Sequence, residues 1–197
     1  MSEAALPSRM NLEEFLPWQE HQEKRYELVD GQPVAMAGAK QTHDRIVVNS
    51  IIRIGGKLDG NPCRPFSADL TVVTRERNGR HPDFGVDCGP FDPESVVAAD
   101  PRVVLEVFSP STRRMDQIAK LDEYKAVPSI EHIVLVDPDS PEVIVWSRAE
   151  DCSWHHDTLR GLDATLALPA IGVEVPLADL HTGITFRPRP RAAVQSP

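Results

Sequence analysis

The sequence has few cysteines and no long apolar run. Its three cysteines, Cys63, Cys88 and Cys152, are odd in number and widely separated. This pattern predicts neither a disulfide framework nor a zinc site, and it favours a reducing compartment such as the cytoplasm. No stretch approaches the roughly 18 apolar residues needed to cross a bilayer, and the N-terminus lacks a basic segment followed by an apolar one. We therefore expect an unexported protein without membrane contact.

Positive charge is also scarce. The chain carries 21 Lys and Arg against 30 Asp and Glu, a formal net charge of −9, which argues against a broadly basic nucleic-acid binder. A local basic groove can still coexist with an acidic remainder, and carboxylates around a metal add to the negative total. With 41% apolar residues, the 197-residue chain can build one core. We expect a single domain over residues 1–185 and a flexible, proline-rich tail over 186–197.

Patterns in the first part of the chain predict two helices and a hairpin. Asn11 and Glu14 have the spacing of a capping box, which predicts a short helix. Asp30-Gly31 separates two apolar stretches and predicts a hairpin, because both residues enter positive φ easily. Apolar residues three and four apart over 42–58 predict a longer helix with one buried face. That face comprises Val47, Ile51, Ile54 and Leu58.

The rest of the chain predicts strands around one further helix. Residues 103–108 form an almost continuous apolar run, typical of a central strand covered on both faces. Hydroxyls at 109–112 are expected to cap a helix over 113–125, and the charged residues 76–80 are expected to form a loop. The remaining strands are expected at 69–74, 82–88, 133–136, 143–146, 154–158 and 165–168. Together these elements predict an α/β fold with a central mixed sheet flanked by helices, with additional hairpins.

Glu106 is an ionisable residue inside the apolar stretch 103–108. Burying its charge without a partner would cost several kcal/mol or shift its pKa until it is neutral. Asp83, on a neighbouring predicted strand, and Lys120, on the following helix, are the candidate partners, together with a divalent cation. We expect all three side chains to meet in one pocket. The simpler alternative is an internal ion pair between these carboxylates and Lys120 or an arginine.

Glu27 and His43 are secondary candidates for the same site. Glu27 lies on the strand face opposite Tyr26 and Leu28, so it could be a further metal ligand or an acceptor behind the ligands. His43, at a helix start, could contact phosphate or position water. The alternatives are a surface ion pair for Glu27 and a capping or surface role for His43. Asp87 shares a predicted face with Asp83 and is an alternative ligand.

Several short motifs occur in a characteristic order. They are Arg25-Tyr26-Glu27-Leu28-Val29-Asp30-Gly31, Pro82-Asp83, Glu106-Val107, Ser109-Pro110-Ser111-Thr112, Asp116-x-x-x-Lys120-x-x-x-Tyr124, Leu135-Val136-Asp137-Pro138 and Leu177-Ala178-Asp179-Leu180. In order and spacing, residues 10 to 183 resemble the Uma-two family of endonucleases, within the PD-(D/E)XK restriction-endonuclease-like superfamily.

The resemblance implies a restriction-endonuclease-like core that cleaves DNA. It implies Mg²⁺ or Mn²⁺ held by Asp83 and Glu106, with a lysine assisting attack on the phosphodiester. The superfamily's usual lysine stands two residues after the glutamate, where this chain has Phe108, so Lys120 would have to supply the amine. We also expect a homodimer, since symmetric cleavage and an exposed hairpin edge both suit a twofold pair. Two alternatives stay open, a nuclease-fold module that binds without cutting and a structural or regulatory homodimer.

Overall fold

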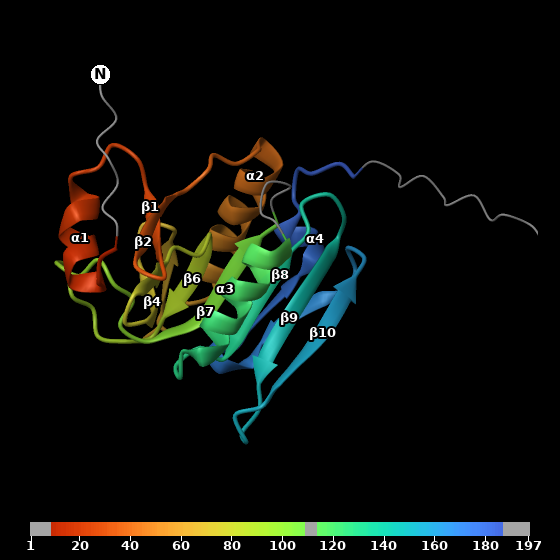
Figure 1. Cartoon of the computed structure of the whole chain (residues 1–197). Coiled ribbons are helices and arrows are strands. Elements are labelled where there is room, and N and C mark those ends of the chain that lie inside the picture. The colour runs from red at the N-terminus through yellow and green to blue at the C-terminus, as the bar shows by residue number, and fades with distance from the viewer. Residues whose placement is uncertain (1–8, 109–113, 187–197) are drawn as a thin grey trace, which may run out of the picture.

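The structure is a computed structural model that describes residues 9–108 and 114–186. Its centre is a six-stranded mixed sheet in the order β10-β9-β8-β7-β6-β3 (Figure 1). The strands are β3 (Arg64–Ser67), β6 (Phe84–Asp87), β7 (Pro101–Val107), β8 (His132–Val136), β9 (Glu142–Arg148) and β10 (Trp154–Arg160). Among these six described strands, β7 and β8 pair in parallel and the other neighbours pair antiparallel. Because parallel neighbours need a crossover, helix α3 (Arg114–Ala126) connects them.

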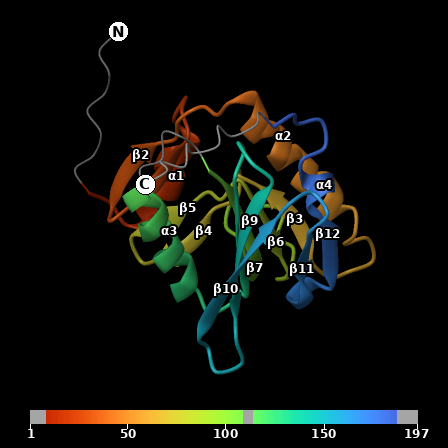
Figure 2. The same cartoon turned by 90° about the vertical axis from the view of Figure 1, so that its right-hand side faces the viewer.

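The two faces of this sheet are covered by different elements (Figure 2). Helix α3 covers one face. The other face is covered by α2 (Gln41–Ser50), η1 (Ile51–Gly55), β11 (Thr165–Leu168), η2 (Pro169–Ile171), β12 (Val173–Pro176) and α4 (Leu177–Leu180). Along β7, Val103, Leu105 and Val107 are buried on the sheet face that α2 and β11 cover, whereas Val104 is buried on the face that α3 covers. This alternation turns Glu106 toward α3.

A second, four-stranded antiparallel sheet lies beside α3. It has the order β2-β1-β5-β4, and its strands are β1 (Tyr26–Val29), β2 (Gln32–Ala35), β4 (Val72–Arg75) and β5 (Asn78–Arg80). Helix α1 (Leu12–Glu20) packs on it through a small core containing Phe15 and Leu28. The β1–β2 turn has φ of 48° at Asp30 and 79° at Gly31, which confirms the predicted hairpin.

The predicted α/β architecture with a central mixed sheet is confirmed. The capping box is also confirmed, because Glu14 N donates to Asn11 Oδ1 at 3.0 Å and Asn11 N donates to Glu14 Oε2 at 2.9 Å. The second helix differs from the prediction, since α2 ends at Ser50 and continues as the π-helical turn η1. Of the predicted face, Ile54 and Leu58 are buried, whereas Val47 and Ile51 are half-buried, and Ile46 is buried in their place.

The predicted charged loop over 76–80 is wrong in its second half. Asn78, Gly79 and Arg80 form strand β5 and are buried. Contacts distant in sequence override the polar composition: the Asn78 side chain accepts from Asp30 N at 2.9 Å. A Cβ on Gly79 would lie 3.0 Å from the Thr71 side chain, so only glycine fits there without a shift. The buried partners of Arg80 are described with the site below.

Four further predictions concern the helix cap at 109–112, the C-terminal tail, the membrane and homodimerisation. The proposed cap at 109–112 and most of the predicted tail, residues 187–197, lie outside the described residues. None of the helices in the described residues combines the length and apolar character needed to cross a membrane. Strand β10 forms one edge of the large sheet, and homodimerisation through an exposed edge stays a prediction.

The absence of a disulfide was predicted wrongly. Cys63 and Cys88 form a disulfide, while Cys152 is free and exposed. Strands β3 and β6 run antiparallel with Arg64 opposite Asp87, so the next residue outward on each strand is a cysteine facing the other. A separation of 25 residues conceals this pairing in the sequence. The disulfide removes the cysteine-based argument for a reducing compartment.

Reduction of the disulfide is expected to lower the free energy of unfolding by about 3 kcal/mol, because the bond closes a medium-length loop in the unfolded chain. Urea unfolding with and without a phosphine reductant would measure the difference. The Cys63→Ser/Cys88→Ser variant should match the reduced protein and should not respond to the reductant. Cys152→Ser serves as the control and should keep the full response. An equal unfolding midpoint in both conditions would contradict a stabilising bond.

Candidate active site

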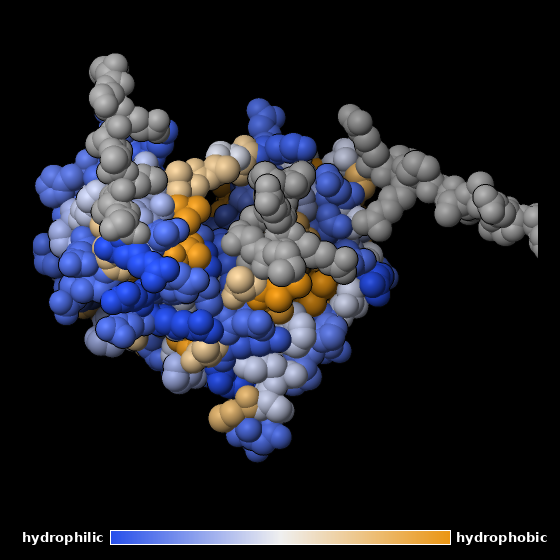
Figure 3. All heavy atoms as spheres, viewed as in Figure 1, coloured by the Kyte–Doolittle hydropathy of each residue, from blue (hydrophilic) through white to orange (hydrophobic). Residues whose placement is uncertain are grey.

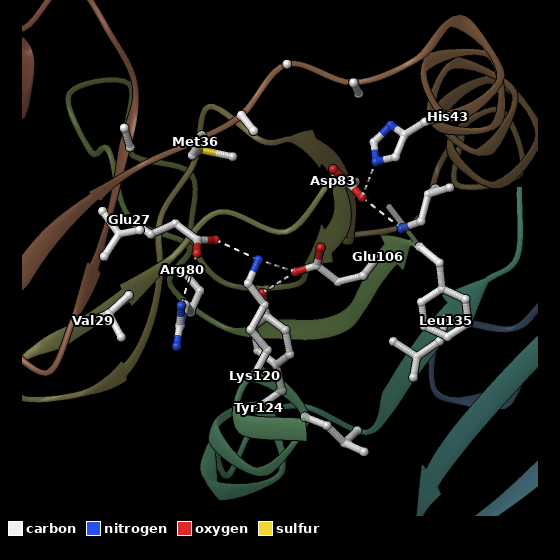
Figure 4. A pocket seen from close by; sticks show the side chains of 18 residues that line it. Glu27, Val29, Met36, His43, Arg80, Asp83, Glu106, Lys120, Tyr124 and Leu135 are labelled. Carbon is white, nitrogen blue, oxygen red and sulfur yellow. Dashed lines mark hydrogen bonds and ion pairs between the residues drawn. The ribbon is translucent and has the colours of Figure 1, made fainter. Parts of the chain in front are cut away.

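A cavity of about 340 Å³ lies between the β1–β2 hairpin, the end of β7 and helix α3 (Figure 4). The five predicted site residues come from separate elements, and all line this cavity. They are Glu27 on β1, His43 on α2, Asp83 before β6, Glu106 on β7 and Lys120 on α3. The fold therefore brings together side chains that are up to 93 positions apart, from Glu27 to Lys120.

Asp83 and Glu106 are cross-strand neighbours. Phe84 pairs with Leu105 in the antiparallel β6–β7 register, so the next residue outward on each strand is one of the two carboxylates. Asp83 Oδ2 also accepts from Val107 N at 2.8 Å, which fixes this carboxylate beside the end of β7. Residues opposite one another on antiparallel strands point to the same face. The sheet thus presents both carboxylates to the α3 side.

Asp87, the alternative ligand, lies away from this cavity. It is at the other end of β6, beyond a register shift after Val86. Its Oδ1 accepts from Asp100 N at 2.6 Å, and its Oδ2 lies 3.5 Å from Arg64 Nη2. Asp87 therefore belongs to a separate hydrogen-bond network.

Helix α3 brings two polar side chains to Glu106. Lys120 Nζ lies 3.4 Å from Glu106 Oε1 and 2.9 Å from Glu27 Oε1. One turn later, the Tyr124 hydroxyl donates to Glu106 Oε1 at 2.8 Å. Phe108, at the usual lysine position of the superfamily, lines the cavity as an apolar residue. The ammonium group at this site consequently comes from α3.

The charges around Glu106 are strongly coupled. Burial raises the pKa of Glu106 to about 7; Lys120 and the Tyr124 hydroxyl oppose this rise, whereas Asp83 and Glu27 add to it. Burial alone would lower the pKa of Lys120, but the carboxylates of Glu106 and Glu27 outweigh it and raise that pKa. Lys120 therefore keeps its proton near neutral pH and can act as a donor but not as a base.

His43 lies in the first turn of α2 and contacts Asp83. Its Nε2 is 3.1 Å from Asp83 Oδ2. Burial alone would lower the pKa of His43, but the hydrogen bond and charge of Asp83, with smaller contributions from Glu106 and Asp44, raise it overall. His43 therefore holds Asp83 Oδ2 from helix α2, while Val107 N holds the same oxygen from strand β7.

Sequence reasoning missed Arg80, which lines the cavity, and Glu123, which pairs with Arg80 behind it. Arg80 Nε and Nη2 donate to the two oxygens of Glu123 at 2.8 and 2.6 Å, and Nη1 donates to Glu27 Oε2 at 3.0 Å. Glu27 also accepts from His81 N at 3.3 Å. Both oxygens of Glu27 are therefore engaged, which favours a role in positioning Lys120 over one as a metal ligand. The charged stretch 76–80 gave no signal of a buried arginine.

The network has a sealed part and an open part. The side chains of Arg80, Glu27 and Glu123 are only 1%, 9% and 8% exposed. Those of Asp83 and Glu106 are each 17% exposed, and that of Lys120 is 14% exposed. The nearly sealed side chains hold the elements together, whereas Asp83, Glu106 and Lys120 are more exposed and line the cavity.

The carboxylates fit a hard divalent cation bound with few protein ligands. No group of three or more His, Cys, Asp or Glu side chains within the described ranges is arranged to hold a metal. Asp83 and Glu106 use Oδ2 and Oε1 in hydrogen bonds, while Oδ1 and Oε2 have no partner among the described residues. Mg²⁺ commonly binds through one or two carboxylates, with water and substrate phosphate completing its octahedron. This donor set suits Mg²⁺ or Mn²⁺ better than a closed zinc site.

Comparison with known proteins gives consistent relatives. The Uma2 family model, described as "Putative restriction endonuclease", matches residues 12–178. The Synechocystis sp. protein slr1290 is 31% identical over 180 residues, covering 90% of this chain and 94% of the relative. A second Synechocystis sp. protein, sll1609, is 22% identical over 157 residues, covering 78% and 89%. The crystal structure of a "putative nuclease belonging to DUF820" from Anabaena variabilis matches with a TM-score of 0.71 at 18% identity, covering 88% of this chain and 98% of that one. This likeness confirms the predicted fold class.

Proposed function

Because the chain belongs to the Uma2 family of restriction-endonuclease-like proteins, we propose that it is a Mg²⁺- or Mn²⁺-dependent endonuclease that hydrolyses phosphodiester bonds of DNA. The observation that carries this proposal is the open part of the charge network. Asp83, Glu106 and Lys120, which are 14–17% exposed, meet at a cavity of about 340 Å³.

Each side chain has a role in this proposal. Asp83 and Glu106 would hold the cation, which when bound would serve as a Lewis acid toward the phosphodiester. A cation also offsets the charge that burial disfavours on Glu106. Lys120 would donate to the attacking water or to a phosphoryl oxygen, stabilising the charge that develops at phosphorus. Glu27 holds the Lys120 ammonium from behind at 2.9 Å, and His43 holds Asp83.

The direct test is incubation of the purified protein with supercoiled, linear and single-stranded DNA plus Mg²⁺ or Mn²⁺. We expect cleavage that requires the cation and stops on chelation. Metal-dependent binding of DNA without cleavage would instead favour the non-catalytic module. If the protein neither cleaves nor binds any of these DNA substrates, the proposal is overturned.

A thermal melt tests the metal site separately from catalysis. Mn²⁺ at about 100 times its dissociation constant should stabilise the fold by about 2.7 kcal/mol, because it binds only the folded chain. Asp83→Asn should lose this gain, since the amide removes a charged ligand. Asp87→Asn, at the other end of β6, should keep it. A gain of the same size in both variants would show that the cation binds elsewhere.

A further inference from the structure

One wall of the cavity is apolar and open to solvent. It is formed by residues 34–39, the end of β2 and the segment that follows, which we call the apolar wall. Val34 is 48% exposed although it is a large aliphatic residue. Figure 3 shows apolar side chains gathered over this part of the molecule, bordering a hollow. In Figure 4, Met36 lies on this side of the cavity and Leu135 lies across from it.

The backbone of the wall also has groups free to bind a ligand. The amides of Ala37, Gly38 and Ala39 donate no hydrogen bond to another described residue. No other heavy atom lies within 4 Å of a Cβ built on Gly38, so the chain there is approachable. The wall therefore offers apolar side chains beside polar backbone groups.

Phosphate is a poor match for this wall. The cationic side chains among the described lining residues are already paired, Arg80 with Glu27 and Glu123, and Lys120 with Glu27 and Glu106. Duplex DNA presents its phosphates outward, with one negative charge per about 1.7 Å of helix axis. A duplex phosphate against the apolar wall would lose hydration without gaining a cation. A nucleobase suits the wall better, because its faces are apolar and its edge carries donors and acceptors.

We propose that the apolar wall holds the nucleobase adjoining the scissile phosphodiester, so that the substrate is DNA with an unpaired nucleotide. This inference rests on the proposed nuclease function and names its substrate class. A cavity of about 340 Å³ lies near the lower end of the roughly 300–1,000 Å³ range of small-ligand pockets, a size for one nucleotide and not for a duplex. Extruding a base is easiest where it is already unpaired.

The test compares matched duplexes that differ at one position. One is fully paired, one carries a single unpaired nucleotide, and one carries an abasic residue at that unpaired position. With Mn²⁺, we expect cleavage beside the unpaired nucleotide to be faster than in the paired duplex by about tenfold or more. The abasic duplex keeps the sugar-phosphate backbone but lacks the base. It should therefore be cleaved only slightly faster than the paired duplex. Equal rates on all three substrates would overturn the inference and leave the nuclease function standing.

A matched pair of variants ties the preference to the wall. Val34→Ser, tested alone and with Met36→Ser, should reduce the ratio of cleavage at the unpaired base to cleavage at the abasic site. Val48→Ser is the control, because Val48 is similarly exposed at 37% but does not line the cavity. An unchanged ratio in the Val34 and Met36 variants would reject this wall as the base site.

Binding separates the inference from the proposed function. Fluorescence of 2-aminopurine at the unpaired position should change when the base enters the wall, and the unpaired duplex should bind more tightly than the abasic one. If the unpaired duplex binds more tightly than the abasic one but no DNA is cleaved, the base site is supported and the proposed nuclease function fails. Equal affinity for the two duplexes would overturn the base site even if no cleavage occurs.

Discussion

Lys120→Ala is expected to lower the rate of DNA cleavage by about 100- to 1,000-fold, the usual loss when a positioned donor to developing charge is removed. The ammonium lies 3.4 Å from Glu106 and 2.9 Å from Glu27, and both carboxylates keep it protonated. Lys120→Arg should restore little activity, because a planar guanidinium cannot occupy the same compact position. Single-turnover cleavage at saturating Mn²⁺ would measure the loss.

The control for this variant lies on the same helix. Lys125 is five residues later and does not line the cavity. Its Nζ lies 3.2 Å from the centroid of the Trp146 ring. Lys125→Ala should therefore cleave at the rate of the unmodified protein. Cleavage that persists undiminished in both Lys120→Ala and Glu106→Gln would come from a contaminating nuclease and would remove the catalytic role proposed for this site.

Glu106 shows why part of the site could be predicted from sequence. A carboxylate inside an apolar strand is a local conflict, and such conflicts often mark functional sites. The period of two along β6 and β7 then places Asp83 and Glu106 on one face, as the register shows. Lys120 is indicated by the family resemblance, since a helical lysine alone is usually a solvated residue. The structure brings these side chains together at one cavity.

Cys63 and Arg80 show why the remainder could not be predicted. The disulfide depends on the register between β3 and β6, which local sequence does not encode. The carboxylate partners of Arg80 lie 43 and 53 positions away along the chain. Neither partner is close to Arg80 in the sequence, and the polar residues around it are typical of a loop. Only the packing of β5 between β1 and β4 reveals that it is buried.

Arg80→Met is expected to destabilise the fold by about 3–5 kcal/mol, because removing one partner leaves buried charges uncompensated. For a chain of this size the loss corresponds to roughly 6–20 °C in Tm. The guanidinium is 1% exposed and donates three hydrogen bonds to Glu27 and Glu123. Chemical denaturation of the variant would measure the change. Arg80→Lys should lie in between, because it keeps the charge but loses the two-pronged contact with Glu123.

Arg102→Met is the matched control, since Arg102 also pairs with two carboxylates but is 36% exposed. Solvent screens such pairs, so we expect a loss of at most about 1 kcal/mol. Adding Glu123→Gln to Arg80→Met should recover part of the stability, because the amide removes one orphaned charge. If Arg80→Met costs no more than Arg102→Met, burial is not what makes this network strong. In that case Glu27 would hold Lys120 beside Glu106 without support from Arg80. The buried Arg80–Glu123 pair would then not be what positions the side chains at the cavity.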